Sequence, residues 1–218
     1  MKQIIKNWRL FEEKNKFPYE IYCDMDGVLV DFESGAVDTI NKSFKDPIPD
    51  SKKLRKLLMK IAAMSPPGAD LEISISDIKH KPVKITKRMK LVRDYMYRLL
   101  ENNYDFWANL VPEPGYLKLW GYISQYNPYI LSAPMQGEYS KEGKREWVRK
   151  NLTPQPKSII LDTEKYKYAI GPAGRPNVLI DDFTKNTIPW EQQGGIAILH
   201  TDINKTIDEL EKIRYGGD

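Results

Sequence analysis

Five short apolar runs, rich in β-branched and aromatic residues, are spaced along this 218-residue chain and constrain its fold more than any other feature. Segments whose apolar residues recur at helical spacing alternate with the later runs. The apolar runs are residues 19–30, 129–131, 158–161, 177–180 and 195–199, and the helical segments are 116–126, 141–151 and 203–213. Strands that alternate with helices predict an α/β fold, in which helices cover both faces of a mostly parallel sheet.

Between the first and second apolar runs the pattern changes to helices alone. Apolar residues recur at helical spacing over 54–62 and 89–99, with a loop expected at 65–68. Residues 32–105 contain 15 Lys and Arg against 10 Asp and Glu, a net charge of +5. We therefore predict an α/β core formed by residues 1–32 and 104–218, with a basic helical insertion at 33–103. A short amphipathic helix is also expected over residues 4–14.

Polar side chains stand where three of the predicted strands stop. Asp24 lies within the first apolar run, Ser132 follows the second, and Asp181 with Asp182 follows the fourth. Ligands of open parallel sheets bind outside the carboxyl ends of the strands. We therefore expect these four residues to share one site.

The first of these strand ends has the composition of a metal site. Asp24 and Asp26 are two residues apart, so an extended backbone points both carboxylates the same way. A hard, oxygen-binding cation such as Mg²⁺ relieves the repulsion between them, and Asp181 or Asp182 would complete its site. Gly27 then permits a sharp departure of the backbone beside a substrate.

The same residue types can transfer a phosphoryl group. An aspartate can attack phosphorus, and a second carboxyl can protonate the leaving oxygen and later activate water. A hydroxyl such as that of Ser132, a lysine and Mg²⁺ can neutralise the phosphoryl oxygens. Taken singly, Asp-x-Asp-Gly is a common turn and Asp-Asp a common helix N-cap. Their joint occurrence at strand ends is what predicts a catalytic site.

Bulk composition narrows the class of protein. Hydrophobic residues make up 41% of the chain and charged residues 29%, as in ordinary globular proteins. The net charge of +4 suits an anionic substrate, although a solvated surface gives the same balance. A single cysteine, Cys23, excludes an intramolecular disulfide and indicates a reducing compartment. Because no stretch approaches the ~20 apolar residues of a membrane span, we expect a cytoplasmic protein with no membrane partner.

The run Asp-Met-Asp-Gly-Val-Leu-Val-Asp-Phe at 24–32 resembles the first motif of the haloacid dehalogenase-like (HAD) hydrolases, and more narrowly of their 5'(3')-deoxyribonucleotidase branch. Further segments that resemble this branch are 106–115, 130–134, 144–148, 179–182, Trp190 and 194–195. The resemblance covers 20–32 and 104–200, whereas 33–103 is similar only in position and helical character. It implies a Rossmann-like core, with the insertion forming a small helical cap over the active site.

The resemblance also implies a role for each acidic residue. Asp24 would be the nucleophile and a ligand of Mg²⁺. Asp26 would be the general acid and base, with its backbone carbonyl on the metal. Asp181 and Asp182 would complete or orient the Mg²⁺ site.

The resemblance further implies a set of residues around the substrate phosphate, namely Ser132, Ala133, Lys144 and Lys165. Ser132 would hydrogen-bond the phosphoryl group, and Lys144 would assist there. Ala133 stands where the family often has a hydroxyl, so one substrate contact would be missing. Lys165 falls where the lysine of the third motif is expected. Two other lysines compete for that position, Lys157 and Lys167.

These roles predict a Mg²⁺-dependent phosphomonoesterase that hydrolyses (deoxy)nucleoside monophosphates through an aspartyl-phosphate intermediate. A nucleic-acid 3'-phosphatase and a phosphatase of other small metabolites are alternatives with the same chemistry. A nucleic-acid substrate is not favoured, because the sequence lacks a long basic stripe with interleaved aromatic residues. A catalytically silent nucleotide-binding module is less consistent with the presence of both Asp24 and Asp26. The sequence leaves open the base and sugar preference, the position of the phosphate, and the oligomeric state, a homodimer included.

Overall fold

The structure is a computed structural model that describes residues 17–45, 51–66, 70–79 and 84–216. The helix expected over 4–14 and part of the loop expected at 65–68 lie outside these residues. The chain divides into two compact units. The described residues of the first, here called the sheet unit, come from Met1–Val28, Pro114–Ala133 and Leu152–Asp218. Those of the second, the helical unit, come from Leu29–Glu113 and Pro134–Asn151.

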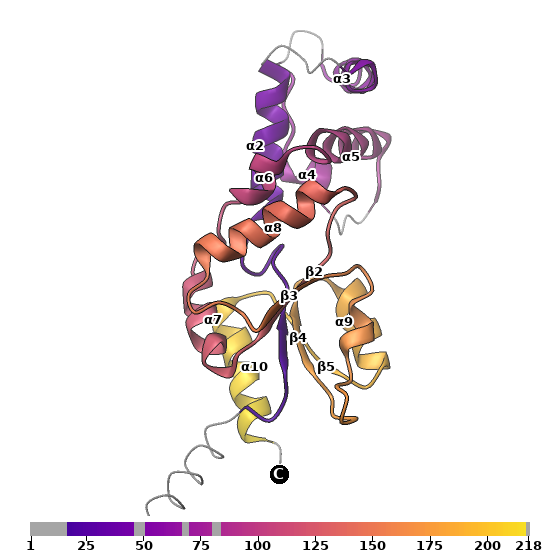
Figure 1. Ribbon diagram of the computed structural model, residues 1–218. Helices are drawn as coiled ribbons and strands as arrows, with labels where there is room; N and C mark the ends of the chain where they lie inside the picture. The colour runs from indigo at the N-terminus through magenta and orange to yellow at the C-terminus, as the bar shows by residue number, and fades with distance from the viewer. Residues whose placement is uncertain (1–16, 46–50, 67–69, 80–83, 217–218) are drawn as a thin grey trace, which may run out of the picture. The chain divides into compact units, whose positions relative to one another are not determined.

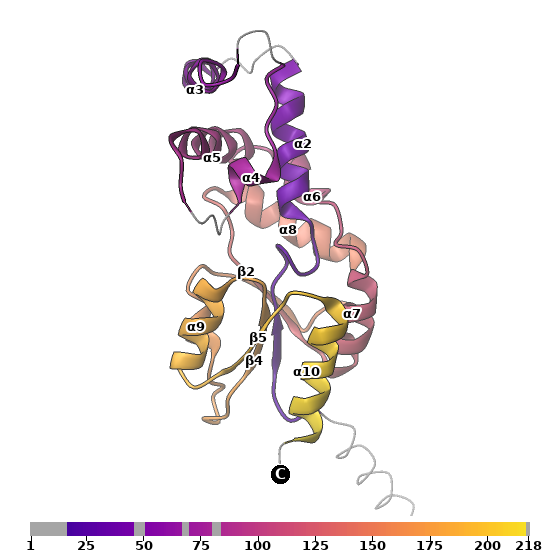
Figure 2. The same cartoon turned by 180° about the vertical axis from the view of Figure 1, so that it is seen from behind.

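The sheet unit contains five strands in the order β3-β2-β1-β4-β5. The strands are β1 (Ile21–Cys23), β2 (Tyr129–Ser132), β3 (Ser158–Leu161), β4 (Val178–Asp181) and β5 (Ile196–Leu199). Every neighbouring pair is parallel, which confirms the predicted α/β fold. Helices α7 (Tyr116–Ile123) and α10 (Ile203–Tyr215) lie on one face of the sheet, and α9 (Thr184–Gln192) lies on the other (Figures 1 and 2). Two short 3₁₀ segments, η1 (Ser124–Tyr126) and η2 (Lys165–Tyr168), connect these elements.

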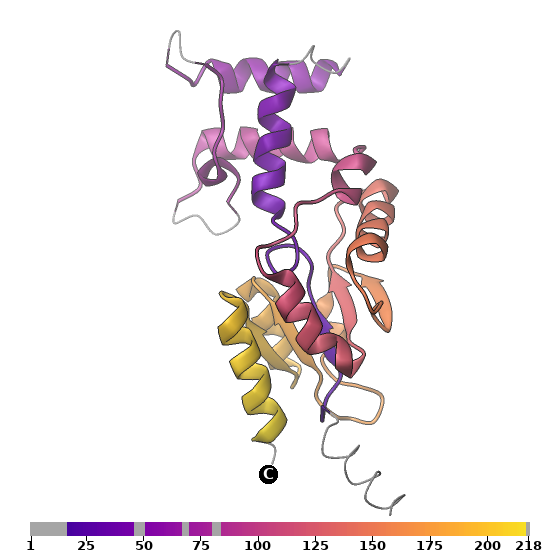
Figure 3. The same cartoon turned by 90° about the vertical axis from the view of Figure 1, so that its left-hand side faces the viewer.

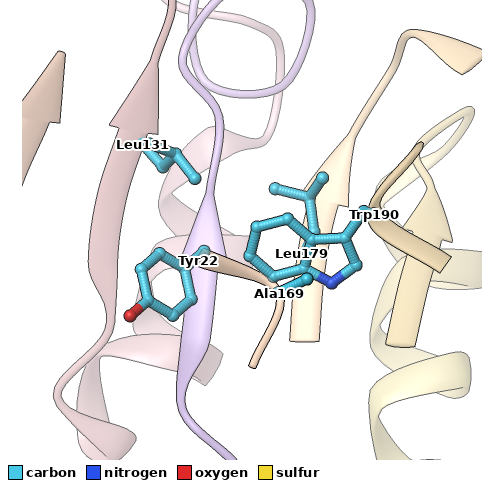
Figure 4. Packing of buried hydrophobic residues seen from close by; sticks show 5 residues of the cluster. All are labelled: Tyr22, Leu131, Ala169, Leu179 and Trp190. Atoms are coloured by element: carbon cyan, nitrogen blue, oxygen red, sulfur yellow. The ribbon is translucent and has the colours of Figure 1, made fainter. Parts of the chain in front are cut away.

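A buried cluster, here called the aromatic cluster, attaches α9 to the sheet (Figure 4). Its members are Tyr22, Leu131, Ala169, Leu179 and Trp190. Tyr22 and Leu179 are register partners on β1 and β4, so their side chains point to the same face, where Trp190 of α9 packs against them. The indole N–H of Trp190 donates to the carbonyl of Asn177 at 3.1 Å, which satisfies its polar group within the core. A Cβ on Gly195 would lie 2.3 Å from the indole nitrogen, so only glycine fits there. This packing fixes α9, and with it the residues just before it, to the carboxyl end of β4.

The first strand is shorter than the sequence predicts. The apolar run over 19–30 indicates one long strand, but β1 ends at Cys23 and the chain turns, with the amide of Val28 donating to the carbonyl of Met25. The run stays apolar because Val28, Leu29 and Val30 are fully buried outside the sheet. Asp24 therefore directly follows the last residue of β1, at the strand end where the predicted site requires it.

The helical unit is built from six helices of the described chain. They are α2 (Phe32–Lys45), α3 (Lys52–Ala62), α4 (Ile75–Ile78), α5 (Lys87–Leu100), α6 (Tyr104–Ala108) and α8 (Glu138–Asn151). Figure 3 shows α3 running beside α5. The unit extends beyond the predicted insertion 33–103, because α8 packs closely on α6, with Gly143 so near Trp107 that a Cβ would lie 2.3 Å from the Cβ of Trp107. The role of 33–103 as a cap over the active site stays a prediction.

Two polar anchors hold the irregular segments of the helical unit. The amide group of Asn41 bonds both the N–H and the carbonyl of Ile73. The guanidinium of Arg88 pairs with Asp77 at 2.9 Å and also donates to the Ser65 hydroxyl and to the carbonyl of Glu72. Helices in the described ranges are all too short or too polar to cross a membrane.

Candidate active site

A buried lysine bridges two buried aspartates at the carboxyl end of the sheet. The ammonium nitrogen of Lys165 lies 2.6 Å from Asp24 Oδ2 and 2.6 Å from Asp181 Oδ2. The three residues are 2%, 5% and 0% exposed, respectively. Asp24 follows β1, Asp181 ends the neighbouring strand β4, and Lys165 begins η2. Chain segments distant in sequence are thus brought together at one point.

Backbone geometry fixes Asp24 in this position. Its N–H donates to the carbonyl of Ile180 at 2.9 Å, which extends the pairing of β1 with β4 by one residue. Its Oδ1 accepts the N–H of Met25 at 2.7 Å, while Oδ2 faces Lys165. Each carboxylate oxygen therefore has a defined donor, and the side chain is held in one orientation.

Asp181 is held by more donors than sequence reasoning anticipated. Its Oδ1 accepts the N–H of Phe183 at 2.9 Å, and the side-chain amide of Asn186 donates to both carboxylate oxygens at 3.0 Å. Asn186 was not among the predicted site residues. It stands in the first turn of α9, five residues after Asp181, where a short polar side chain can reach back to the preceding loop.

Charge and burial act against each other within this cluster. Burial lowers the pKa of Lys165, but the charges of Asp24 and Asp181 outweigh that effect and the net shift is upward, so the ammonium stays protonated. Burial first, and then the charge of Asp24, raise the pKa of Asp181, while Lys165 opposes the rise. Two buried carboxylates that share one ammonium contribute less to the stability of the fold than well-packed apolar side chains would. Such an arrangement is typical of functional sites.

A third carboxylate adjoins the pair. One oxygen from each of Asp24, Asp181 and Asp182 lies within 4.8 Å of the others, and Asp182 is only half-buried. Three carboxylates and the Lys165 ammonium sum to a charge of −2 when all are ionised, which a divalent cation balances. Carboxylate oxygens are the ligands that Mg²⁺ prefers. This donor set therefore fits Mg²⁺.

Gly27 makes room for that third carboxylate. Its φ is +73°, and a Cβ placed on it would lie 2.7 Å from Asp182 Cγ. Only glycine adopts this backbone conformation without strain and also leaves space for the carboxylate. The predicted departure of the chain at Gly27 is thus observed, and it has a second role in seating Asp182.

Gly27→Ala is expected to weaken Mg²⁺ binding by about tenfold, a loss of roughly 1.4 kcal/mol, because the new methyl group displaces the Asp182 carboxylate. The strained φ should also lower the free energy of unfolding by about 1–2 kcal/mol. Isothermal titration with Mg²⁺ and thermal unfolding measure the two effects. Gly121→Ala is the matched control. Gly121 lies in α7, and a Cβ placed there would have no atom within 4 Å apart from those of its chain neighbours and its own helix backbone. Equal Mg²⁺ affinity in the Gly27 variant and the wild type would contradict this role.

Asp162, a residue that sequence reasoning missed, bonds the end of β2 and the loop that leads to Lys165. The N–H of Asp162 donates to the carbonyl of Ser132 at 3.1 Å, where β2 and β3 end. The Asp162 carboxylate in turn accepts the N–H of Glu164 at 2.9 Å and the hydroxyl of Tyr168 at 3.1 Å. These bonds shape the loop that brings Lys165 inward. Ser132 itself is fully buried at the end of β2, followed by the half-buried Ala133.

The three candidate lysines of the third motif occupy different environments. Lys165 is the one whose ammonium contacts Asp24 and Asp181. Lys167 is exposed and pairs with Glu164, and Lys157 pairs with Glu20 at 2.6 Å.

Two further predicted site residues are Lys144 and Asp26. Lys144 belongs to the helical unit, where it is fully buried with its ammonium 5.5 Å from the centre of the Trp107 ring. Its contact with a phosphate stays a prediction. Asp26 is half-buried in the turn after β1. The predicted contact of Asp26 with the metal is through its backbone carbonyl, whereas the grouping of Asp24, Asp181 and Asp182 concerns side-chain oxygens. The role of Asp26 therefore stays a prediction as well.

Comparison with known proteins identifies the fold. The sequence matches no family model and no curated protein. The structure is similar to that of the HAD-hydrolase YfnB from Bacillus subtilis, with a TM-score of 0.50 and 13% identity, covering 90% of this chain and 100% of that one. A hydrolase from Streptococcus pneumoniae is also similar, with a TM-score of 0.47 and 12% identity, covering 88% of this chain and 98% of that one. With its five-stranded parallel sheet, the likeness to YfnB assigns this chain a HAD-like, Rossmann-type core.

Proposed function

We propose that this protein is a Mg²⁺-dependent phosphomonoesterase that hydrolyses (deoxy)nucleoside monophosphates. The observation that carries the proposal is the buried Asp24–Lys165–Asp181 bridge beside Asp182, at the carboxyl ends of adjacent strands. Burying two carboxylates on one lysine does not favour stability over apolar packing, so a chemical role is the better account of it. The HAD-like core supports a hydrolase, and the B. subtilis protein with the similar fold is described as bound to magnesium.

In the proposed reaction Asp24 attacks phosphorus, and the bond between phosphorus and the ester oxygen breaks. Asp26 gives its proton to the leaving oxygen of the nucleoside. Water then attacks the aspartyl-phosphate, Asp26 takes up its proton, and phosphate and Asp24 are released. Lys165 orients Asp24 for the first step through their 2.6 Å contact. Ser132 is proposed to hydrogen-bond the phosphoryl oxygens.

Asp24, Asp181 and Asp182 would hold the metal. Bound Mg²⁺ would neutralise charge on the phosphoryl oxygens and allow the anionic substrate to approach a cluster of carboxylates. Without a cation, the net negative charge of that cluster repels a phosphate.

The choice of a nucleotide as substrate rests on the resemblance of 24–32 to the 5'(3')-deoxyribonucleotidase branch, which extends past the aspartates to Asp31 and Phe32. Those two residues lie near the start of the helical unit, where Asp31 accepts the N–H of Ser34 and Phe32 starts α2. The run therefore continues beyond what the phosphoryl chemistry alone needs. This is why we favour a nucleotidase over a phosphatase of unspecified metabolites.

A panel of phosphate esters tests the proposal. It contains ribo- and deoxyribonucleoside 5'- and 3'-monophosphates, sugar phosphates and 3'-phosphorylated oligonucleotides, each assayed for phosphate release with Mg²⁺ and with a chelator. We expect release from deoxyribonucleoside monophosphates that falls at least 100-fold on chelation and returns with added Mg²⁺. A strong preference for oligonucleotides or sugar phosphates would overturn the nucleotidase assignment. Absence of release from every ester would favour the silent binding module.

A further inference from the structure

Helix α3 of the helical unit has an outer face made almost entirely of cations. Residues 51–66 contain five basic side chains and no acidic one: Lys52, Lys53, Arg55, Lys56 and Lys60. All five are exposed, and within the described parts of the chain none of the four lysines forms an ion pair. Lys52, Lys56 and Lys60 recur every four residues, so they line one side of the helix at intervals of about 6 Å.

This charge distribution opposes the stability of the helix itself. Lysines four residues apart repel each other across each turn. Lys52 and Lys53 also occupy the first turn, where the helix dipole favours acidic residues, and that turn contains none. A solvated helix face normally mixes both signs of charge. A sequence that breaks the rules of helix stability without a gain in packing indicates a functional role for the helix. A polyanion bound to this face would offset both the repulsion between the lysines and the unfavourable charge in the first turn.

The opposite face of α3 is already occupied. Leu54, Leu57, Leu58 and Ile61 are buried, and the helix packs along α5 (Figure 3). The apolar side is therefore not available to enter a lipid bilayer, as the apolar side of a membrane-binding amphipathic helix must. The outer face of the helix adds one large exposed apolar side chain, Met59, which is too little for membrane insertion. A phosphate backbone needs only the cations.

We propose that the outer face of α3 is a sequence-independent docking surface for nucleic acid, contacting the phosphate backbone through Lys52, Lys56 and Lys60. Helix α3 has no aromatic residue on which unstacked bases could be placed, so double-stranded nucleic acid is the form this surface fits. The surface shares no residue with the carboxylate cluster, and docking there does not depend on the phosphatase activity. It assigns the helical unit a ligand that is larger than the nucleotide substrate.

Fluorescence anisotropy with a labelled 20-base-pair DNA duplex of mixed sequence tests the proposal, over a series of salt concentrations. The test variant is Lys52→Gln/Lys56→Gln/Lys60→Gln. The matched control is Lys150→Gln/Lys205→Gln/Lys212→Gln, which removes the same charge from other positions on the chain. We expect the test variant to bind at least tenfold more weakly than the control, and its slope of log K against log salt to be shallower by about 2 to 3.

The folding of the variants is checked by thermal unfolding. Glutamine forms helices about as well as lysine, so the test variant should unfold at or above the wild-type temperature because like-charge repulsion has been removed. Equal losses of duplex binding in the test and control variants would overturn the proposal, as would absence of duplex binding by the wild type at low salt. Binding to phosphatidylserine vesicles without binding to the duplex would also overturn it, in favour of a membrane surface.

Discussion

Asp24→Asn is expected to lower kcat for phosphate release on the order of 10³-fold or more, while the protein stays folded. A neutral amide is a poor nucleophile towards phosphorus, so the first step of the proposed reaction should be lost. The fold should tolerate the change, because Lys165 keeps its 2.6 Å contact with Asp181 and the cluster carries one less negative charge. Steady-state kinetics on a deoxyribonucleoside monophosphate, together with thermal unfolding, measure both effects.

The matched control is Asp202→Asn. Asp202 is an exposed aspartate whose side chain caps α10 by accepting the N–H groups of Asn204 and Lys205, and asparagine caps helices equally well. The control should keep wild-type turnover and stability. If Asp24→Asn retains more than a tenth of wild-type kcat, Asp24 is not the nucleophile and an aspartyl-phosphate cannot form there.

The sequence located the strands of the sheet well, for a physical reason. The run expected at 158–161 coincides with β3, and β2, β4 and β5 differ from their predicted bounds by a single residue at one end or both. Each is a short apolar run that turn-forming residues bound on both sides. The first run continues past its turn-forming residues, Asp26 and Gly27, because Val28 to Val30 are buried by packing outside the sheet. Burial alone does not distinguish a strand from a buried turn.

Helix α9 was not anticipated. Its sequence, Thr-Lys-Asn-Thr-Ile-Pro-Trp-Glu-Gln, buries only Thr187 and Trp190 and contains Pro189, so the apolar periodicity is too weak to read. One large side chain, Trp190, fixes the helix through the aromatic cluster. The helix is therefore stabilised by tertiary packing, and its local sequence pattern does not predict it.

The site was predictable only in part. The rule that ligands meet the carboxyl ends of parallel strands selects Asp24, Ser132 and Asp181 from spacing alone. Lys165 could not be chosen from spacing, because Lys157 and Lys167 are close to it in sequence and only the loop conformation separates them. Asn186 and Asp162 act by orienting neighbours through hydrogen bonds. Such roles have no sequence motif, since many side chains can donate or accept a hydrogen bond from many positions.

Lys165→Met is expected to lower the free energy of unfolding by about 3–5 kcal/mol when no divalent cation is present, because it removes the ammonium from two buried carboxylates. Asp24 and Asp181 are 5% and 0% exposed, so water cannot replace the lost partner. Added Mg²⁺ should recover part of the loss, since a cation that binds only the folded state stabilises it by mass action. Urea unfolding with a chelator and with Mg²⁺ measures both quantities.

Lys167→Met is the control that isolates this effect, because it removes the same charge two residues away. Lys167 and its partner Glu164 are about half exposed as side chains, so water solvates either group when the other is removed. Its unfolding should match that of the wild type within error, with and without Mg²⁺. Equal destabilisation of the two variants would show that Lys165 contributes only as a surface lysine does. A loss in Lys165→Met that Mg²⁺ leaves unchanged would show that the cation does not bind the carboxylates that Lys165 neutralises, and would place the metal elsewhere.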